Sequence, residues 1–194
     1  MSVAAIILAA GRGTRFGGEP KLLAELGGKP LVRLVAEAAL RARTDPVVLV
    51  TGHRSAEVEA AVADLPLRTF FNERYEHGLS TSLQAGFRSL PGDAEAAVIL
   101  LADMPRIGAP LIDRLAGAWI EAGRPAALIP TYRGRRGNPV VLSALLRPEI
   151  GELTGDAGAG PLLKRRSDVV LHDVDDPALV QDVDDPAALA ALRR

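Results

Sequence analysis

The chain contains no cysteine, which excludes disulfide bonds, thiolate metal sites and a cysteine nucleophile. It also lacks an excess of charge of either sign, because 23 basic residues face 24 acidic ones and the formal net charge is -1. No global field would therefore recruit nucleic acid or an anionic membrane, and any polyanionic ligand must be bound locally.

Long apolar runs are missing as well. The apolar stretch at residues 3–10 has no basic residue before it and is too short for a signal peptide or a membrane span. We therefore expect a cytoplasmic protein with no nucleic-acid partner and no membrane partner.

What is present is typical of a globular protein of alternating strands and helices. Apolar residues make up 48% of the chain and charged residues 24%, and a length of 194 suits one domain spanning residues 1–194. Short runs rich in valine, isoleucine and leucine predict strands at residues 3–8, 46–50, 67–71, 96–101, 126–130 and 168–172. Amphipathic patterns predict helices at residues 30–42, 55–62 and 110–123, and a closing helix with Asp185 as its cap.

Strands separated by helices predict right-handed crossovers and a mainly parallel, Rossmann-like sheet. The expected fold is therefore a three-layer αβα sandwich of the α/β class. The pattern changes after Pro130, where residues 132–143 (YRGRRGNPVVLS) predict a small basic β-hairpin insertion that leads into a strand at residues 140–142. The basic tip of this hairpin either meets a phosphorylated ligand or simply faces solvent.

A glycine-rich, basic loop follows the first strand at residues 8–21 (LAAGRGTRFGGEPK). Ligands of open parallel sheets bind at the carboxyl ends of the strands, which is where this loop lies. Gly11 and Gly13 would leave backbone N–H groups free to cradle phosphates, and Arg12, Arg15 and Lys21 would add positive charge. The loop therefore predicts a polyanion site.

Two well-known phosphate loops do not fit this stretch. A Walker-type loop starting at Gly13 would need lysine and then serine or threonine where Glu19 and Pro20 stand. A dinucleotide fingerprint needs an immediate helix and an acidic residue at the end of the second strand, whereas Pro20 interrupts the helix and the second strand ends VTGH.

Asp103, in the stretch VILLADMP, directly follows a buried strand on the same sheet edge as the loop. A carboxylate there is costly unless it is solvated, hydrogen-bonded or paired with a cation. Mg²⁺ needs few protein carboxylates, because water and phosphates complete its shell. A cap of the following turn is the alternative role. For a second ligand the repeated stretch DVDDP, at residues 173–177 and 182–186, offers two clusters between which the residues alone do not choose.

Six motifs occur in an order that resembles the nucleotidyltransferases of molybdenum-cofactor biosynthesis, above all the molybdopterin cytidylyltransferases. They are LAAGRGTRFGGEPKLL, GLSTSLQAG, LLADMP, RGNPVV, LTGDAGA and DVDDPAAL, and they span nearly the whole chain. The first and third belong to the wider superfamily of nucleoside-triphosphate transferases, and the others point to the narrower group. The resemblance implies a nucleotide-diphospho-sugar-transferase-like fold and Mg²⁺-dependent nucleotidyl transfer with release of pyrophosphate.

The resemblance also implies roles for single residues. Arg15 and Lys21 would hold the triphosphate, with Lys21 at the α-phosphate, and Asp103 would bind Mg²⁺, which makes these three the expected catalytic residues. Because the terminal DVDDP cluster matches the family's, Asp182 is the expected second metal ligand and Asp184 the reserve. The expected nucleotide-binding residues, from the loop and from the resemblance together, are Leu8, Ala9, Ala10, Gly11, Arg12, Gly13, Ser80 and Ser82.

We therefore expect transfer of CMP from CTP to molybdopterin, with a molybdoenzyme as the receiver of the product. A sugar phosphate or another phosphorylated acceptor, GTP as the donor, and non-catalytic carriage of the finished cofactor are the alternatives. Two departures from the family pattern bear on the acceptor. Asn138 stands where the family usually has histidine, and Gly160 stands where it usually has arginine.

Overall fold

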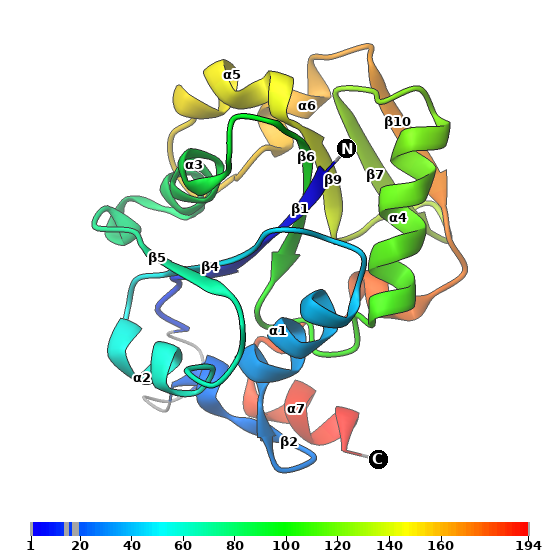
Figure 1. The fold of residues 1–194 in the computed structure, drawn as a ribbon. Helices are drawn as coiled ribbons and strands as arrows, with labels where there is room; N and C mark the ends of the chain where they lie inside the picture. The colour runs from blue at the N-terminus through cyan, green and yellow to red at the C-terminus, as the bar shows by residue number, and fades with distance from the viewer. Residues whose placement is uncertain (1, 14–15, 17–19, 194) are drawn as a thin grey trace.

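Strands and helices alternate along the chain in a computed structural model that describes residues 2–13, 16 and 20–193 (Figure 1). The strands are β1 (Ser2–Ala9), β2 (Glu25–Leu26), β3 (Lys29–Pro30), β4 (Val47–Thr51), β5 (Arg68–Phe71), β6 (Ala94–Leu101), β7 (Ala127–Tyr132), β8 (Arg135–Arg136), β9 (Val140–Ser143) and β10 (Val169–Asp173). The α-helices are α1 (Leu31–Arg41), α2 (Ser55–Ala60), α3 (Leu79–Ser89), α4 (Ala109–Glu121), α5 (Arg147–Gly151), α6 (Gly160–Lys164) and α7 (Pro186–Leu192). Short 3-10 turns are η2 (Lys21–Leu23), η3 (Tyr75–His77), η4 (Ala144–Leu146) and η5 (Pro177–Val180). In the described part of the chain, no helix is long and apolar enough to cross a membrane.

The main sheet has the strand order β10-β7-β9-β6-β1-β4-β5, with β8 paired to β7. Strand β1 lies between β4 and β6 and is parallel to both. Strand β9 runs antiparallel between β6 and β7, and β7 with β8 forms the predicted hairpin insertion. The mainly parallel sheet confirms the predicted α/β class. It also places the carboxyl ends of β1, β4 and β6 side by side, as expected for the ligand-binding edge.

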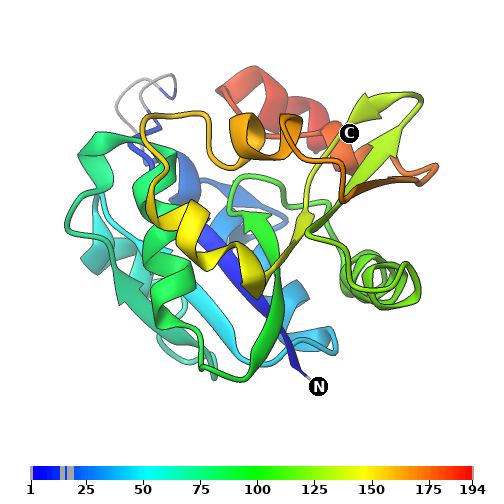
Figure 2. The same cartoon turned by 90° about the horizontal axis from the view of Figure 1, so that it is seen from above.

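Alternate residues of β1 face opposite sides of the sheet and belong to two different cores. Ala5 and Ile7 pack in a core with residues of α1, α2 and α4. Ala4 and Ile6 pack in another with residues of α3, α5 and α6. Figure 1 shows these two groups of helices on opposite faces of the sheet, and Figure 2 shows α4 end-on and away from α3 and α5. The predicted three-layer sandwich is therefore confirmed.

A third, smaller core joins the two ends of the chain. It consists of Phe16 from the first loop, Leu31 at the start of α1, and Val183 and Leu189 from the terminal segment. All four side chains are buried. This core holds the terminal aspartate cluster against the loop that follows β1.

Helix α3 is an element that the apolar patterns did not predict. Its buried residues include Ser80, Thr81, Ser82 and Gln84, so polar side chains interrupt the apolar periodicity. Serine and threonine also favour caps and turns over helix interiors. The amide of Gln84 donates to the carbonyl oxygens of residues 150, 151 and 153 at 3.2, 3.0 and 2.9 Å, which explains its burial.

Candidate functional site

Lys21 lies between two carboxylates that come from distant parts of the chain. Its Nζ is 2.7 Å from Asp103 Oδ2 and 2.9 Å from Asp184 Oδ1. The side chains of Lys21 and Asp103 are 11% and 21% exposed, whereas that of Asp184 is 47% exposed. The pair between Lys21 and Asp103 is therefore the better shielded from solvent and the stronger one.

The ammonium of Lys21 stays charged. Burial disfavours the charged form, but the attraction of Asp103 and the hydrogen bonds to both carboxylates outweigh it, so the pKa of Lys21 is raised above its ordinary value of 10.5. A group that is protonated in this way cannot act as a general base at neutral pH. It can neutralise carboxylates or phosphates. The family resemblance implies this role for Lys21 at a bound triphosphate.

The second oxygen of Asp103 gives a test of whether a metal ion fits here. Asp103 Oδ1 is buried and has no hydrogen-bond partner among the described residues. An unpaired buried carboxylate oxygen is costly, and a cation would satisfy it. Across those same residues, no group of three or more acidic or histidine side chains gathers as a ready-made metal site. This donor set therefore fits an ion such as Mg²⁺, which keeps waters and phosphate oxygens in its shell.

The terminal segment presents Asp184, rather than Asp182, to this site. The backbone N–H of Val183 donates to the carbonyl oxygen of Asp103 at 2.9 Å, and the Val183 side chain is buried in the third core. Asp185 caps α7, because its Oδ1 accepts from the N–H of Ala188 at 2.7 Å. Asp182 is exposed, while Asp184 lies at Lys21. Asp184, the expected reserve, is therefore the one of the two that lies at Lys21, and the choice of Asp182 as the second metal ligand stays a prediction.

The first DVDDP stretch serves a structural purpose away from Lys21. Asp173 ends β10 and accepts a hydrogen bond from the Thr131 hydroxyl at 3.1 Å. Asp176 caps η5 by accepting from the N–H of Ala178 at 2.9 Å. These contacts are ordinary turn and capping chemistry for aspartate near proline.

A cavity of about 520 Å³ opens beside the Lys21 cluster at the carboxyl ends of β1 and β6. Eight of the residues expected at a nucleotide or metal site line it, namely Leu8, Ala10, Gly11, Arg12, Gly13, Lys21, Ser82 and Asp103. Ala9 and Ser80 do not, because both are buried away from it, at 1% and 0% exposure. Arg15, the other expected triphosphate ligand, lies outside the described residues.

The loop after β1 owes its shape to one glycine. Gly13 has φ +57, which favours glycine, and a Cβ there would lie 2.9 Å from Lys21 Cβ. Its carbonyl oxygen accepts from the N–H of Phe16 at 3.0 Å. Gly11 has open space around it, so its backbone is accessible from the cavity. Arg12 is exposed and forms an ion pair with Glu76, and both residues line the cavity.

Seven further lining residues escaped sequence reasoning: the polar Tyr75, Glu76 and Asp156, and also Leu22, Gly78, Leu79 and Leu101. The close approach of Tyr75 depends on Gly52, where a Cβ would lie 2.6 Å from Tyr75 Cβ and 2.8 Å from Ala10 Cβ. The sequence signal for this contact is Gly52 itself, a glycine that directly follows β4, whose carboxyl end lies beside the first loop. Asp156 belongs to the LTGDAGA motif, but no residue pattern indicated which member faces the cavity.

A second cavity of about 300 Å³ adjoins the first and shares Leu8, Leu79 and Leu101 with it. Its lining is mainly apolar and comes from β6, β7, β9 and α6. Arg136, Asn138 and Gly160 also line it. The two positions that depart from the family pattern, Asn138 and Gly160, therefore lie together in one pocket.

Residues 5–170 match the family of the MobA-like NTP transferase domain, and the chain belongs to this family. The nicotine blue oxidoreductase of Paenarthrobacter nicotinovorans is 32% identical over 191 residues, which cover 90% of this chain and 88% of that protein. The bifunctional protein GlmU of Sorangium cellulosum is 32% identical over 158 residues, or 78% of this chain and 33% of GlmU. The chain thus spans about one third of that relative's length.

Among solved structures, Rv0371c from Mycobacterium tuberculosis H37Rv is 25% identical with a TM-score of 0.87, over 100% of this chain and 98% of that one. A second structure of Rv0371c, with a TM-score of 0.83 and 24% identity over 99% and 98% of the two chains, is a complex with manganese. The chain accordingly carries a MobA-like NTP transferase domain, and its fold is that of the family.

Proposed function

We propose that residues 1–194 form a single nucleotidyltransferase domain that transfers CMP from CTP to molybdopterin and releases pyrophosphate. The observation that carries the proposal is the ion-paired arrangement of Lys21 with Asp103 and Asp184, of which Lys21 and Asp103 line the 520 Å³ cavity. One ammonium and two carboxylates beside a glycine-rich loop suit a metal-bound triphosphate. We further propose that the reaction takes place in the cytoplasm, where nucleoside triphosphates are available, and that a molybdoenzyme receives the product.

The proposed role of each residue follows from its position in the site. Leu8, Ala10 and Gly11 would surround the nucleoside at the end of β1, and Lys21 would hold the α-phosphate. Asp103 and Asp184 would hold the divalent cation, which we take to be Mg²⁺. When bound, the cation supplies neutralisation of the triphosphate charge. Arg15 would add a second positive charge from the part of the loop that the structure does not describe.

The reaction needs positioning and neutralisation of charge rather than a protein nucleophile. A phosphate oxygen of the acceptor attacks the α-phosphorus in line. The bond from the α-phosphorus to the bridging oxygen breaks, and that oxygen leaves with pyrophosphate. Lys21 would stabilise the charge on the α-phosphate as it develops.

The second cavity supports the choice of acceptor. Its mainly apolar lining offers a surface on which a flat ring system can pack, with Arg136 and Asn138 as the polar contacts. A sugar phosphate carries several hydroxyl groups and would need more polar partners than these side chains provide. Sugar-phosphate acceptors are nevertheless the second candidate, because the motifs LAAGRGTRFGGEPKLL and LLADMP resemble those of the wider superfamily of nucleoside-triphosphate transferases.

The test is pyrophosphate release with Mg²⁺ and molybdopterin, run in parallel with CTP, GTP and ATP. We expect release that depends on molybdopterin and is fastest with CTP. Asp184→Asn should lower turnover by about a hundredfold or more, as the loss of one group that stabilises the transition state does. Asp182→Asn is the matched control, because Asp182 is exposed and two residues away. Nucleotide binding without pyrophosphate release for any acceptor would instead support the carrier function.

A further inference from the structure

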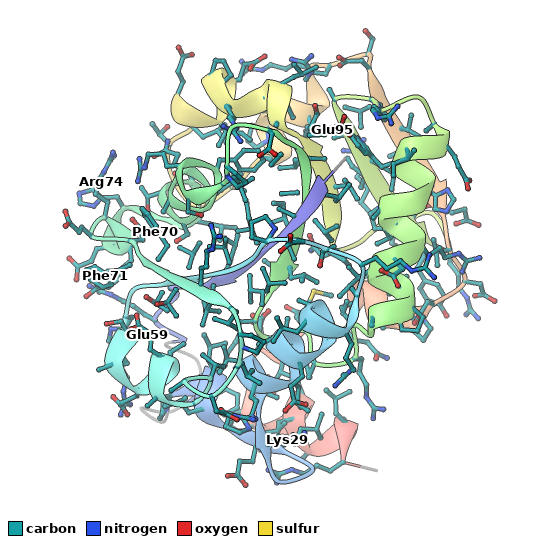
Figure 3. All side chains as sticks on the ribbon, in the orientation of Figure 1. Lys29, Glu59, Phe70, Phe71, Arg74 and Glu95 are labelled. Carbon is teal, nitrogen blue, oxygen red and sulfur yellow. The ribbon has the colours of Figure 1, made fainter. Side chains whose placement is uncertain are left out.

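The buried side-chain amide of Asn72 contacts Ser82, a residue that lines the 520 Å³ cavity. Asn72 follows β5 directly, and only 2% of it is exposed. Its backbone N–H donates to the carbonyl oxygen of Thr51 at 2.9 Å, which fixes the residue at the end of the sheet. Figure 3 labels Phe70, Phe71 and Arg74, which precede and follow Asn72 at this corner of the molecule. Asn72 itself does not line the cavity.

The neighbours of Asn72 decide which end of its amide donates. The backbone N–H of Arg74 donates to Asn72 Oδ1 at 3.0 Å, so this atom must be the carbonyl oxygen. The other end, Nδ2, then donates to Thr81 Oγ1 at 2.9 Å and to Ser82 Oγ at 3.1 Å. Thr81 agrees with this orientation, because its hydroxyl donates to the carbonyl oxygens of Arg74 and Gly78 at 2.8 and 2.9 Å.

This network determines the polarity of Ser82. Its hydroxyl accepts a hydrogen bond from Asn72, and among the described residues no acceptor faces its own proton. Ser82 is 4% exposed and lines the 520 Å³ cavity. A hydroxyl whose lone pair is occupied by an amide and whose proton is free presents a donor to whatever enters the cavity.

We propose that Asn72 is a positioning residue that makes the Ser82 hydroxyl a hydrogen-bond donor to an acceptor atom of the bound nucleoside. The inference rests on the proposed function, because it requires a nucleoside triphosphate in this cavity. The inference goes beyond the proposed function in two ways. It assigns a role to Asn72, which lies outside the cavity, and it states that the Ser82 hydroxyl donates to the nucleoside. A nucleoside that offers an acceptor at this point would gain this hydrogen bond, whereas one without an acceptor would leave the Ser82 proton unpaired.

The decisive variant is Asn72→Asp, which keeps the shape of the side chain and reverses its polarity. A carboxylate accepts from Arg74 N–H as before, but it also accepts from Ser82 and so consumes the proton intended for the ligand. The measurement is the dissociation constant of CTP with Mg²⁺ by calorimetry. We expect the affinity to fall about three- to tenfold, the usual contribution of one neutral hydrogen bond, and Ser82→Ala to have the same effect.

The double variant separates polarity from other effects of the new charge. If the carboxylate acts only through Ser82, adding Asn72→Asp to Ser82→Ala weakens CTP binding no further. Asn72→Ala should lower the melting temperature yet retain more affinity than Asn72→Asp, since it leaves the Ser82 proton free. Ser89→Ala is the matched control on the same helix, because the Ser89 hydroxyl donates to Gly86 O at 2.7 Å and the residue is not part of the cavity lining.

Two outcomes would overturn the inference while the proposed function stands. One is an Asn72→Asp variant that binds CTP as tightly as the wild type. The other is a further loss of affinity when Asn72→Asp is added to Ser82→Ala. If the wild-type protein itself binds no nucleoside triphosphate, the proposed function and this inference are both wrong.

Discussion

Replacing Lys21 by methionine should destabilise the protein and make its stability respond to divalent cations. The substitution keeps most of the length of the side chain but removes the ammonium that Asp103 shares with Asp184. Removing one partner of a fully buried ion pair costs about 3–5 kcal/mol, whereas exposed pairs contribute about 0–1 kcal/mol. Asp103 is 21% exposed and Asp184 47%, so we expect a loss between these limits, about 1–3 kcal/mol.

A divalent cation should recover part of this loss, because it can take the place of the ammonium between the two carboxylates. For a weak site with a dissociation constant of about 1 mM, about 10 mM Mg²⁺ would restore about 1.4 kcal/mol. Urea denaturation of the wild type and of Lys21→Met, with and without Mg²⁺, measures both effects. The slope against urea should not change, since the extent of the folded structure is the same.

Lys29→Met provides the matched control. Lys29 pairs with Glu37 at 2.7 Å, but its side chain is 48% exposed on the β2–β3 hairpin, where Figure 3 labels it. Its loss should cost less than about 1 kcal/mol and should create no response to Mg²⁺. The reasoning is refuted if Lys21→Met is as stable as the wild type, or if Mg²⁺ stabilises both variants equally.

Three further predictions concern the scaffold. Hydrogen bonds from Arg33 lower the pKa of Asp64 from 3.8 to about 2, so this contribution to stability is present above pH 3.8 and is lost as the pH falls towards 2. The free energy of unfolding of Asp64→Asn should therefore fall less steeply than that of the wild type over this range in acid denaturation, and equal slopes would contradict the assignment. Gly86→Ala should lower the melting temperature, at a cost of about 1–3 kcal/mol, because its Cβ would lie 2.6 Å from Ile6 Cγ2; an unchanged melting temperature would mean that α3 can shift. Gln84→Met should cost about 1–3 kcal/mol in urea denaturation, because it removes the amide donor from the carbonyl oxygens of residues 151 and 153, whereas that of residue 150 keeps the N–H of Leu153; a vanishing cost would mean that water replaces the amide.

Most of the fold was predictable because its signals are local. Strands that are covered on both faces have continuous apolar runs, and β1, β4 and β6 lie close to the runs at residues 3–8, 46–50 and 96–101. Asp185 caps the last helix as its position before Pro186 suggested. Trp119 is buried in the core at 1% exposure, as an isolated tryptophan on an apolar helix face predicts.

Helix α3 and the Asn72 network were not predictable from local pattern. The buried amide of Gln84 in α3 finds its hydrogen-bond acceptors elsewhere in the chain, at residues 150, 151 and 153. Asn72 follows a strand like many turn residues, and only its contacts with Thr81 and Ser82 distinguish it. Apolar periodicity records burial against a common core, but it does not record such pairings.

The sequence by itself determined the α/β class, the sheet edge that carries the loop, and the presence of Lys21 and Asp103 at that edge. The class and the edge follow from hydrophobic periodicity, Asp103 from its position just after a strand, and Lys21 from the basic, glycine-rich loop motif. Only the tertiary structure decided that Asp184 joins them rather than Asp182, because that choice depends on which side chain of the terminal segment is buried. Val183 fills the third core and pairs with the Asp103 backbone, which turns its neighbour Asp184 towards Lys21.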